Sequence, residues 1–196
     1  MGGMSASRRM GTENTETRQR LIELTERLMM EEGYAAVGIR RVAREADVAP
    51  ALVLYYFRTL DDLFIAVLRR GAEEELARQR AIADDADPLR ALWGLAGRRG
   101  AARITEEFMA LGNHRKAIRA EITAQAERYR RAQLESLTRA QDEGRLDLHG
   151  ATPMAAVVIS TALSRVLVME EEMGLTCGHE ETRTLVEDLL TRMGPA

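Results

Sequence analysis

The chemically reactive side chains of this sequence do not form a pattern that catalysis requires. Its three histidines, His114, His149 and His179, lie far apart on different predicted elements. Cys177 and His179 could bind a stray metal ion, but two ligands in one loop are weak support for a metal site. The sequence has neither a phosphate-binding glycine loop nor the G-x-S-x-G pattern of a nucleophilic serine. We therefore expect no catalytic residues, no metal site, no cofactor and no enzymatic activity.

A different chemistry is suggested near the N-terminus, where a short predicted helix carries Ala51, Leu52 and Tyr55 on one face. Val53 and Phe57, four residues apart, lie on the opposite side and are expected to face the core. A globular core does not require the first face, whereas the major groove of DNA admits such a helix. The helix N-terminus would also present N–H groups and partial positive charge to phosphate.

Two short helices joined by a tight turn are predicted to position that face. The first covers about residues 39–46, and the second opens with Pro50, which is favoured at a first helical position. Asp47 lies in the turn and tolerates the left-handed backbone that a tight turn often needs. A longer helix, from about residue 14 to Gly33, precedes the pair. Together these are the ingredients of a helix-turn-helix.

The rest of the chain also has helical periodicity and no strand-like alternation of useful length. A fourth helix is predicted to start after Thr59, which can cap it together with Asp62, and to end near Ile82. Glycines such as Gly112 are expected to separate the later helices. These later helices are predicted at about residues 88–96, 101–111, 113–143, 153–172 and 179–193. The fold class is therefore all-α, with about nine helices.

Three sequence runs near the N-terminus form one pattern, which extends over about residues 17–68. They are Gly33-Tyr34, the run IRRVAREADVA at residues 39–49 and the run LYYFRTLDDL at residues 54–63. This pattern resembles, end to end, the signature of the TetR family of transcriptional regulators. The resemblance implies a DNA-binding head in which tyrosine hydroxyls and arginines contact phosphates while the second short helix faces the bases. It places these residues at the DNA: Arg40, Arg41, Ala49, Pro50, Ala51, Leu52, Tyr55, Tyr56 and Thr59.

The sequence departs from the family pattern at positions that usually contact phosphate. Val37-Gly38 replaces the common Thr or Ser before the second helix, and Leu60 replaces a lysine. Because the base-facing residues are apolar, we expect readout through thymine methyl groups, DNA shape and arginines. Taken without the family pattern, the tyrosines could equally be half-buried helix residues and the arginines a solvated face.

The helix predicted at 153–172 is apolar almost all round, so it must be buried on more than one side. In TetR-like proteins the last two helices pair with their two-fold mates in a four-helix bundle. The resemblance therefore implies a homodimer and a (pseudo)palindromic operator, with recognition helices roughly 34–36 Å apart. A large monomeric core is the alternative. The expected interface residues are Val157, Ser160, Leu163, Leu167, Val186, Leu189, Leu190 and Met193.

The resemblance also implies a ligand pocket in the helices between the head and the dimer surface. The candidate lining residues, which could also be ordinary core residues, are Trp93, Phe108, Met109, Leu111, His114, Ile118, Ile122 and Tyr129. By analogy with the family, we expect a repressor that a small apolar or aromatic effector releases from DNA. The alternative is a DNA-binding regulator without a small ligand, controlled by a protein partner. The sequence specifies neither the effector nor the operator.

Composition and charge are consistent with this interpretation. The chain has 196 residues, 45% of them hydrophobic, and a net charge of −3 that by itself does not favour a nucleic-acid partner. A single cysteine and the lack of a secretory signal or a long apolar span predict a cytoplasmic protein without membrane contact. The predicted domains are a flexible arm over residues 1–13, a helix-turn-helix domain over 14–60 and a helical regulatory and dimerisation domain over 61–196.

Overall fold

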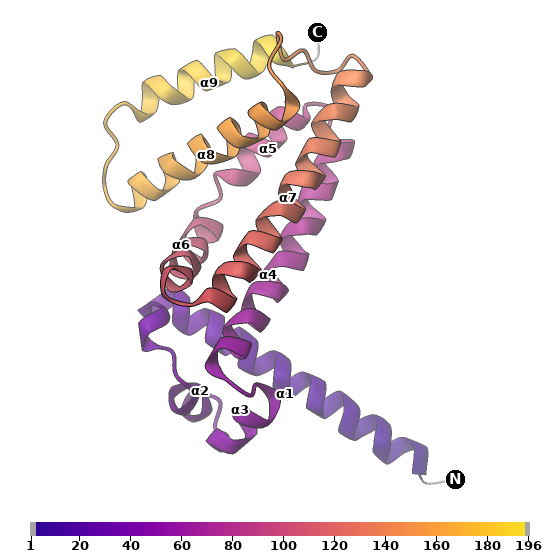
Figure 1. Cartoon of the computed structure of the whole chain (residues 1–196), viewed down its shortest axis with the longest axis vertical. Helices are drawn as coiled ribbons and strands as arrows, with labels where there is room; N and C mark the ends of the chain where they lie inside the picture. The colour runs from indigo at the N-terminus through magenta and orange to yellow at the C-terminus, as the bar shows by residue number, and fades with distance from the viewer. Residues whose placement is uncertain (1–2, 195–196) are drawn as a thin grey trace. The chain divides into compact units, whose positions relative to one another are not determined.

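A computed structural model of the chain describes the backbone of residues 3–194 and the side chains of residues 14–98 and 103–194. This part of the chain contains nine α-helices and two 3-10 turns, and no strand (Figure 1). The all-α prediction is confirmed. In chain order the elements are α1 (Gly3–Glu32), η1 (Tyr34–Ala36), α2 (Ile39–Glu45), α3 (Pro50–Tyr56), α4 (Leu60–Ala81), η2 (Ile82–Asp84), α5 (Pro88–Ala96), α6 (Arg99–His114), α7 (Lys116–Asp142), α8 (Pro153–Glu172) and α9 (His179–Met193).

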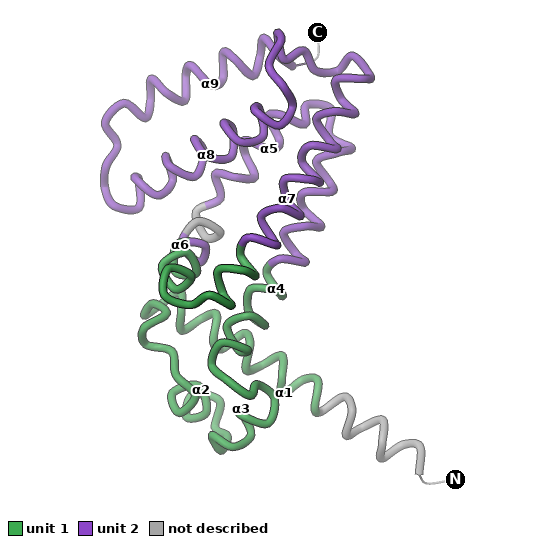
Figure 2. Tube along the Cα trace, in the orientation of Figure 1, with its two compact units in different colours: residues 1–71, 106–122 green, residues 72–105, 123–196 purple. Residues whose placement is uncertain are grey.

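The helices divide into two compact units (Figure 2). Unit 1 comprises Met1–Gly71 and Glu106–Ile122, and unit 2 comprises Ala72–Thr105 and Thr123–Ala196. The change between units therefore occurs within α4, α6 and α7, and the division into domains at residue 60 stays a prediction. The first turns of α4 belong to unit 1 because Leu63, Phe64 and Val67 are buried there.

The predicted arm over residues 1–13 falls on side chains outside the described part of the structure, so it stays a prediction. The bounds of α1 begin at Gly3, earlier than the start near residue 14 that the sequence predicted.

Most helix bounds follow the predicted ones closely, and α5, α8 and α9 coincide with them. Gly112 is an exception, because α6 continues through it to His114. A Cβ atom at Gly112 would lie 3.0 Å from Ile122 Cδ1 and 3.6 Å from Arg119 Cα. The glycine therefore allows α7 to approach α6 closely within unit 1, and the prediction that it ends a helix is wrong.

The predicted cap of α4 is present. The backbone N–H of Asp62 donates to Thr59 Oγ1 at 3.1 Å, and the backbone N–H of Thr59 donates to Asp62 Oδ2 at 3.0 Å. This reciprocal pair is a capping box that satisfies N–H groups for which the first turn has no helical acceptor. Asp61 and Asp62 also place negative charge at the positive end of the helix dipole.

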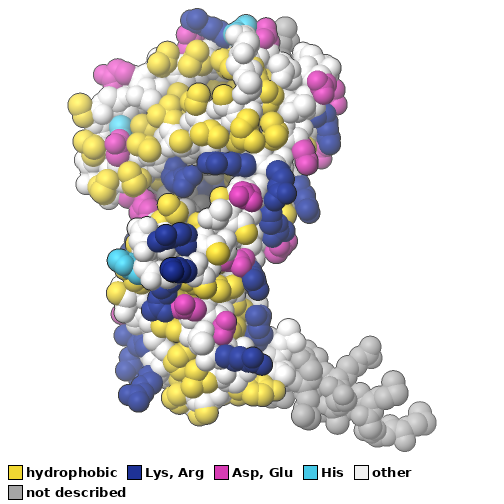
Figure 3. Space-filling model, in the orientation of Figure 1, with side chains coloured by type: hydrophobic (Ala, Val, Ile, Leu, Met, Phe, Trp, Pro, Cys, Tyr) yellow, Lys and Arg dark blue, Asp and Glu magenta, His cyan; other side chains and the backbone are white. Residues whose placement is uncertain are grey.

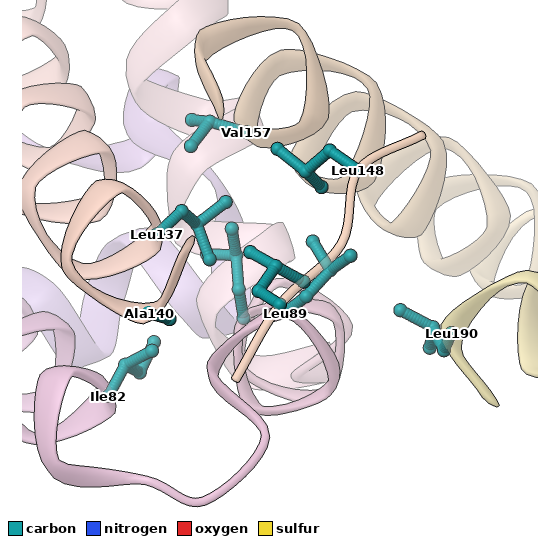
Figure 4. Close-up of a cluster of buried hydrophobic side chains, with 9 residues drawn as sticks. Ile82, Leu89, Leu137, Ala140, Leu148, Val157 and Leu190 are labelled. Atoms are coloured by element: carbon teal, nitrogen blue, oxygen red, sulfur yellow. The ribbon is translucent and has the colours of Figure 1, made fainter. Parts of the chain in front are cut away.

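Unit 2 is built around a cluster of nine buried apolar residues from η2, α5, α7, α8, α9 and the segment between α7 and α8 (Figure 4). They are Ile82, Leu89, Leu92, Leu137, Ala140, Leu146, Leu148, Val157 and Leu190. Burial of each leucine side chain contributes about 1.5–3 kcal/mol. The cluster therefore fixes which side of α8 and of α9 faces inward.

Candidate nucleic-acid interface

The turn between α2 and α3 is held by a Schellman motif. The Val48 N–H donates to the Ala43 carbonyl at 2.9 Å, and the Asp47 N–H donates to the Arg44 carbonyl at 3.2 Å. Between these bonds Asp47 has φ of 54°, the left-handed conformation that the sequence predicted. These bonds end α2 and direct the chain into Pro50, the first residue of α3.

The two sides of α3 have opposite environments, as predicted. Val53 is fully buried, and Phe57, the residue that directly follows α3, is 2% exposed. Tyr55 is 72% exposed, and Leu54 beside it is 45% exposed. An exposed tyrosine and leucine on one short helix contribute nothing to the core of unit 1. The face is therefore available to a partner.

The other residues that were predicted to face the bases differ in their exposure to solvent. Ala49, Pro50 and Ala51 are exposed, whereas Leu52 is half-buried. Leu54 was not among the predicted residues, although its position directly before Tyr55 was a signal that could have identified it. Its exposure extends the apolar face of α3.

The two tyrosines differ in their surroundings. The rings of Tyr55 and Tyr56 meet edge to face with centroids 5.3 Å apart, and Tyr56 is half-buried beside Phe57. The guanidinium of Arg18, on α1, lies 5.2 Å from the centre of the Phe57 ring. Packing on both sides thus fixes the Tyr56 ring, while Tyr55 projects outward.

The two predicted phosphate-gripping arginines also differ. Arg40 is exposed, but Arg41 forms ion pairs with Glu32 at 2.7 Å and with Glu45 at 3.0 Å. These two carboxylates already balance the positive charge of Arg41, which weakens its attraction for a phosphate. Arg44, which is not among the predicted DNA contacts, has a side chain 69% exposed and lies 3.7 Å from a carboxylate oxygen of Glu45.

Two further predicted features at the ends of helices are present. Gly38 precedes α2 without any side-chain cap, as the departure at Val37-Gly38 predicted. Thr59 is exposed, but its hydroxyl already donates to Asp62 Oδ2 at 2.9 Å and accepts from the Asp62 N–H. It can therefore receive a further donor more readily than it can donate to a phosphate.

Part of α6 belongs to the same unit as these helices. Glu107 Oε2 accepts a hydrogen bond of 2.7 Å from the Tyr34 N–H, next to Gly33 with φ of 83°. Arg69 on α4 donates to both carboxylate oxygens of Glu121, at 3.1 and 2.8 Å. This contact raises the pKa of Arg69 above its ordinary value. Specific polar bonds thus connect η1, directly before α2, and α4, after α3, to residues 106–122.

The predicted effector-lining residues are divided between the two units. Phe108, Leu111 and Ile118 are buried in unit 1, where Phe108 meets Phe64 edge-on at 6.5 Å. Met109 and His114 are exposed, and Ile122 is half-buried. Trp93 and Tyr129 are half-buried in unit 2.

Tyr129 has a distinctive environment. Burial and the nearby Glu75 carboxylate raise the pKa of its hydroxyl to about 12.

Two hollows in unit 2 are lined by residues other than the eight candidate effector-lining residues. Among the described residues, no group of three His, Cys, Asp or Glu side chains could hold a metal ion.

The predicted dimer residues fall on both sides of α8 and α9. Val157, Leu167 and Leu190 are buried within their own chain. Ser160 and Leu163 are half-buried, and Val186 and Met193 pack against the cluster of Figure 4. Of the eight, only Leu189 is an exposed large apolar residue.

The outward apolar side of α8 and α9 consists of other residues. Ile159 is 64% exposed and Val166 is exposed on α8, and Leu185 is exposed beside Leu189 on α9. Figure 3 shows hydrophobic side chains gathered over this part of unit 2. α8 is also long and apolar enough to cross a membrane by length and composition, and it is the one helix of the described chain that is. One such helix is weak evidence for a membrane span, because a core helix of a soluble protein passes the same test.

Comparison with known proteins agrees with this architecture. The sequence pattern described as "Bacterial regulatory proteins, tetR family" matches residues 21–67. A protein described as a transcriptional regulator from Saccharomonospora viridis, crystallised in complex with choline, has a TM-score of 0.77 and 21% identity, covering 93% of this chain and 99% of that chain. A TetR transcription regulator from Haloarcula marismortui has a TM-score of 0.75 and 19% identity, covering 92% and 99%.

A third structure, the multidrug binding protein EbrR complexed with malachite green, is 27% identical with a TM-score of 0.60, covering 91% of this chain and 98% of that chain. No curated protein sequence matches this chain at a significant level. Residues 21–67, which lie in α1 to α4, match the pattern of the TetR family of bacterial regulatory proteins, and the described chain has the fold of the solved transcriptional regulators named above.

Proposed function

We propose that this transcriptional regulator is a homodimeric repressor that binds a duplex operator through α3 and is released by a small apolar or aromatic effector. The observation that carries the proposal is the division of α3 into a buried side, with Val53 and Phe57, and an outward side, with Tyr55 72% exposed. The buried side fixes the helix on unit 1, so the outward side is presented rigidly. A rigidly held, exposed helix after a tight turn is what enters a major groove.

The residues around α3 can divide the work of recognition. Ala51, Leu52 and Leu54 offer apolar groups to thymine methyls, and the Tyr55 hydroxyl can donate to a phosphate or a base edge. Arg40 and Arg44 are exposed and can bind phosphates. In this proposal Arg41 contributes by tying α2 to Glu32 of α1 rather than by direct contact.

A second copy of the chain is proposed to cover the outward side of α8 and α9. Ile159, Val166, Leu185 and Leu189 are exposed apolar side chains on these two helices. Large exposed apolar surfaces on a soluble protein mark interaction sites. Two copies related by a two-fold axis would bury these residues against their equivalents, which explains the apolar character of α8 without a membrane.

The proposed effector is a small molecule. Structures similar to this chain were solved with choline and with malachite green, which supports a small-molecule ligand here as well. The second candidate is a regulator controlled by a protein partner. It is favoured by one observation, that the predicted lining residues are divided between buried core positions and exposed positions.

Selection of bound fragments from genomic DNA by the purified protein, followed by a competition assay, tests the proposal. We expect recovery of fragments that share a (pseudo)palindromic sequence, one dimer bound per site, and release by one or more members of a panel of aromatic and apolar compounds. Recovery of a shared sequence without release by any compound, but with release by a cell extract from which small molecules have been dialysed, would support the protein-partner alternative. Recovery of random fragments only would contradict operator binding.

A further inference from the structure

Unit 2 carries an open hollow of about 410 Å³ between the C-terminal part of α4, the turn η2 and α7. Volumes of this order are typical of small-molecule sites. The site described above is α3, in unit 1, and the hollow contains none of its residues. The lining residues are Leu76, Arg80, Ala83, Asp84, Arg128, Arg131, Ala132, Glu135, Ser136 and Arg139.

The two helices that line the hollow are held together by buried side chains. Leu76 and Ser136, two of the lining residues, are buried. Beside them α4 and α7 are joined by a buried hydrogen bond of 2.9 Å from Gln133 Nε2 to Gln79 Oε1. The α7 residues of the wall lie at intervals of three, four and seven positions, which places them on one face of that helix. The wall therefore presents several side chains of a single rigid helix toward one space.

The charges on the wall are unusual for a surface that serves only solubility. Four arginines and two carboxylates line the hollow, a net charge of +2. Arg80, Arg131 and Arg139 form no ion pair with any described side chain, although Asp84 and Glu135 line the same space. The fourth arginine of the wall, Arg128, pairs with Glu73 at 3.0 Å, and Arg69 and Arg90 elsewhere in the chain are also held by carboxylates. Figure 3 shows basic side chains along the α7 side of this unit.

We propose that this hollow binds a small phosphate ester that also carries hydroxyl groups. Guanidinium groups bind phosphate oxygens through paired charge-assisted hydrogen bonds, and three arginines line this hollow without an ion pair to a described carboxylate. A phosphate monoester carries a charge of about −1.5 to −2 near neutral pH, which matches the net charge of the wall. Asp84 and Glu135 can accept hydrogen bonds from the hydroxyl groups of the ester.

The same two carboxylates argue against a nucleic-acid backbone as the ligand. A continuous row of phosphates would place some of them against Asp84 or Glu135, whereas a single phosphate can be confined to the arginine side. The proposal is independent of operator binding and of effector release, since none of the α3 residues takes part.

Isothermal titration calorimetry of the full-length protein with glycerol 3-phosphate, inorganic phosphate and glycerol tests the proposal. We expect saturable binding of glycerol 3-phosphate at one site per chain, weaker binding of inorganic phosphate and no heat of binding with glycerol. Arg131→Gln and Arg139→Gln should each weaken glycerol 3-phosphate binding about tenfold, the usual effect of removing a charge-assisted hydrogen bond. Arg130→Gln is the matched control, because Arg130 is the exposed neighbour of Arg131 on α7 and does not line the hollow.

Thermal unfolding monitored by circular dichroism establishes that each variant is folded before titration. An equal loss of binding in Arg130→Gln would mean that the protein attracts anions through its general charge, and the proposed site would be wrong. Absence of saturable binding by the wild-type protein would also overturn it. A third contradictory result is that Arg131→Gln and Arg139→Gln weaken binding of a non-operator duplex while leaving glycerol 3-phosphate unaffected, since the hollow would then serve nucleic acid.

Discussion

At the scale of single residues, burial decides which side chains stabilise the fold and which are available to a partner. Val53 and Phe57 are buried while Tyr55, between them in sequence, is exposed. This alternation was predictable from spacing alone, because residues four apart on a helix share a face. The environment of Arg41 was not predictable, since its partners Glu32 and Glu45 come from two different helices.

Phe57→Ala should destabilise unit 1 by roughly 3–5 kcal/mol, because it removes a buried aromatic side chain and leaves a cavity. Chemical denaturation followed by circular dichroism measures this change. Tyr55→Ala is the control, since its side chain lies outside the core and should change stability by less than about 0.5 kcal/mol. Similar losses of stability in the two variants would mean that α3 faces the other way.

The raised pKa of Tyr129 makes a prediction about alkaline pH. Its folded-state pKa of about 12 lies above the ordinary value of 10.0, so the folded protein holds this proton more tightly than the unfolded chain. The corresponding stability is present below pH 10 and is lost as the pH rises from 10 toward 12. Tyr129→Phe cannot ionise, so its stability should decline less between pH 10 and 12 than that of the wild-type protein. Parallel declines in chemical denaturation would contradict the assignment.

Among the elements, the bounds of the helices were predicted well from the sequence. Which side of an apolar helix faces the core was predicted poorly. The bounds of α5, α8 and α9 were predicted because Pro88 and Pro153 start helices and glycines follow the ends. α8 is apolar almost all round, so its sequence contains little contrast from which an inward side could be chosen. For this reason Val157 and Leu167 were assigned to a dimer surface although they lie in the core.

The turn between α2 and α3 gives a prediction at this scale. Asp47→Val should destabilise the helix-turn-helix by about 1–2 kcal/mol, because a β-branched residue is strained in the left-handed conformation. Asp47→Gly adopts this conformation without strain, so its stability should stay close to the wild-type value. Thermal unfolding of the two variants measures the difference. If valine is tolerated as well as glycine, the left-handed turn is not what positions α3.

In the whole molecule, we propose that a second copy of the chain covers the outward side of α8 and α9. From the sequence, this outward side could be expected only as an excess of apolar residues in the last two helices. The particular residues became clear once the core cluster of Figure 4 had shown which sides are occupied.

Ile159→Asp should convert a dimer into a monomer, because a carboxylate at the centre of an apolar interface loses its hydration without gaining a partner. Light scattering coupled to size-exclusion chromatography would then report about half of the wild-type mass. Met109→Asp is the control, since Met109 is also an exposed apolar residue but lies on α6 in unit 1. If the Ile159→Asp variant keeps the wild-type dimer mass, the interface lies elsewhere.

The affinity of Tyr55 variants for a selected genomic fragment measures whether the outward face of α3 binds DNA. Fluorescence anisotropy at fixed salt should show weaker binding by Tyr55→Ala, by about tenfold or more, with unchanged thermal unfolding. Tyr55→Phe should lose an intermediate amount, because it removes only the hydroxyl. Wild-type affinity in Tyr55→Ala, or an equal loss in the α7 control Arg130→Gln, would contradict the claim.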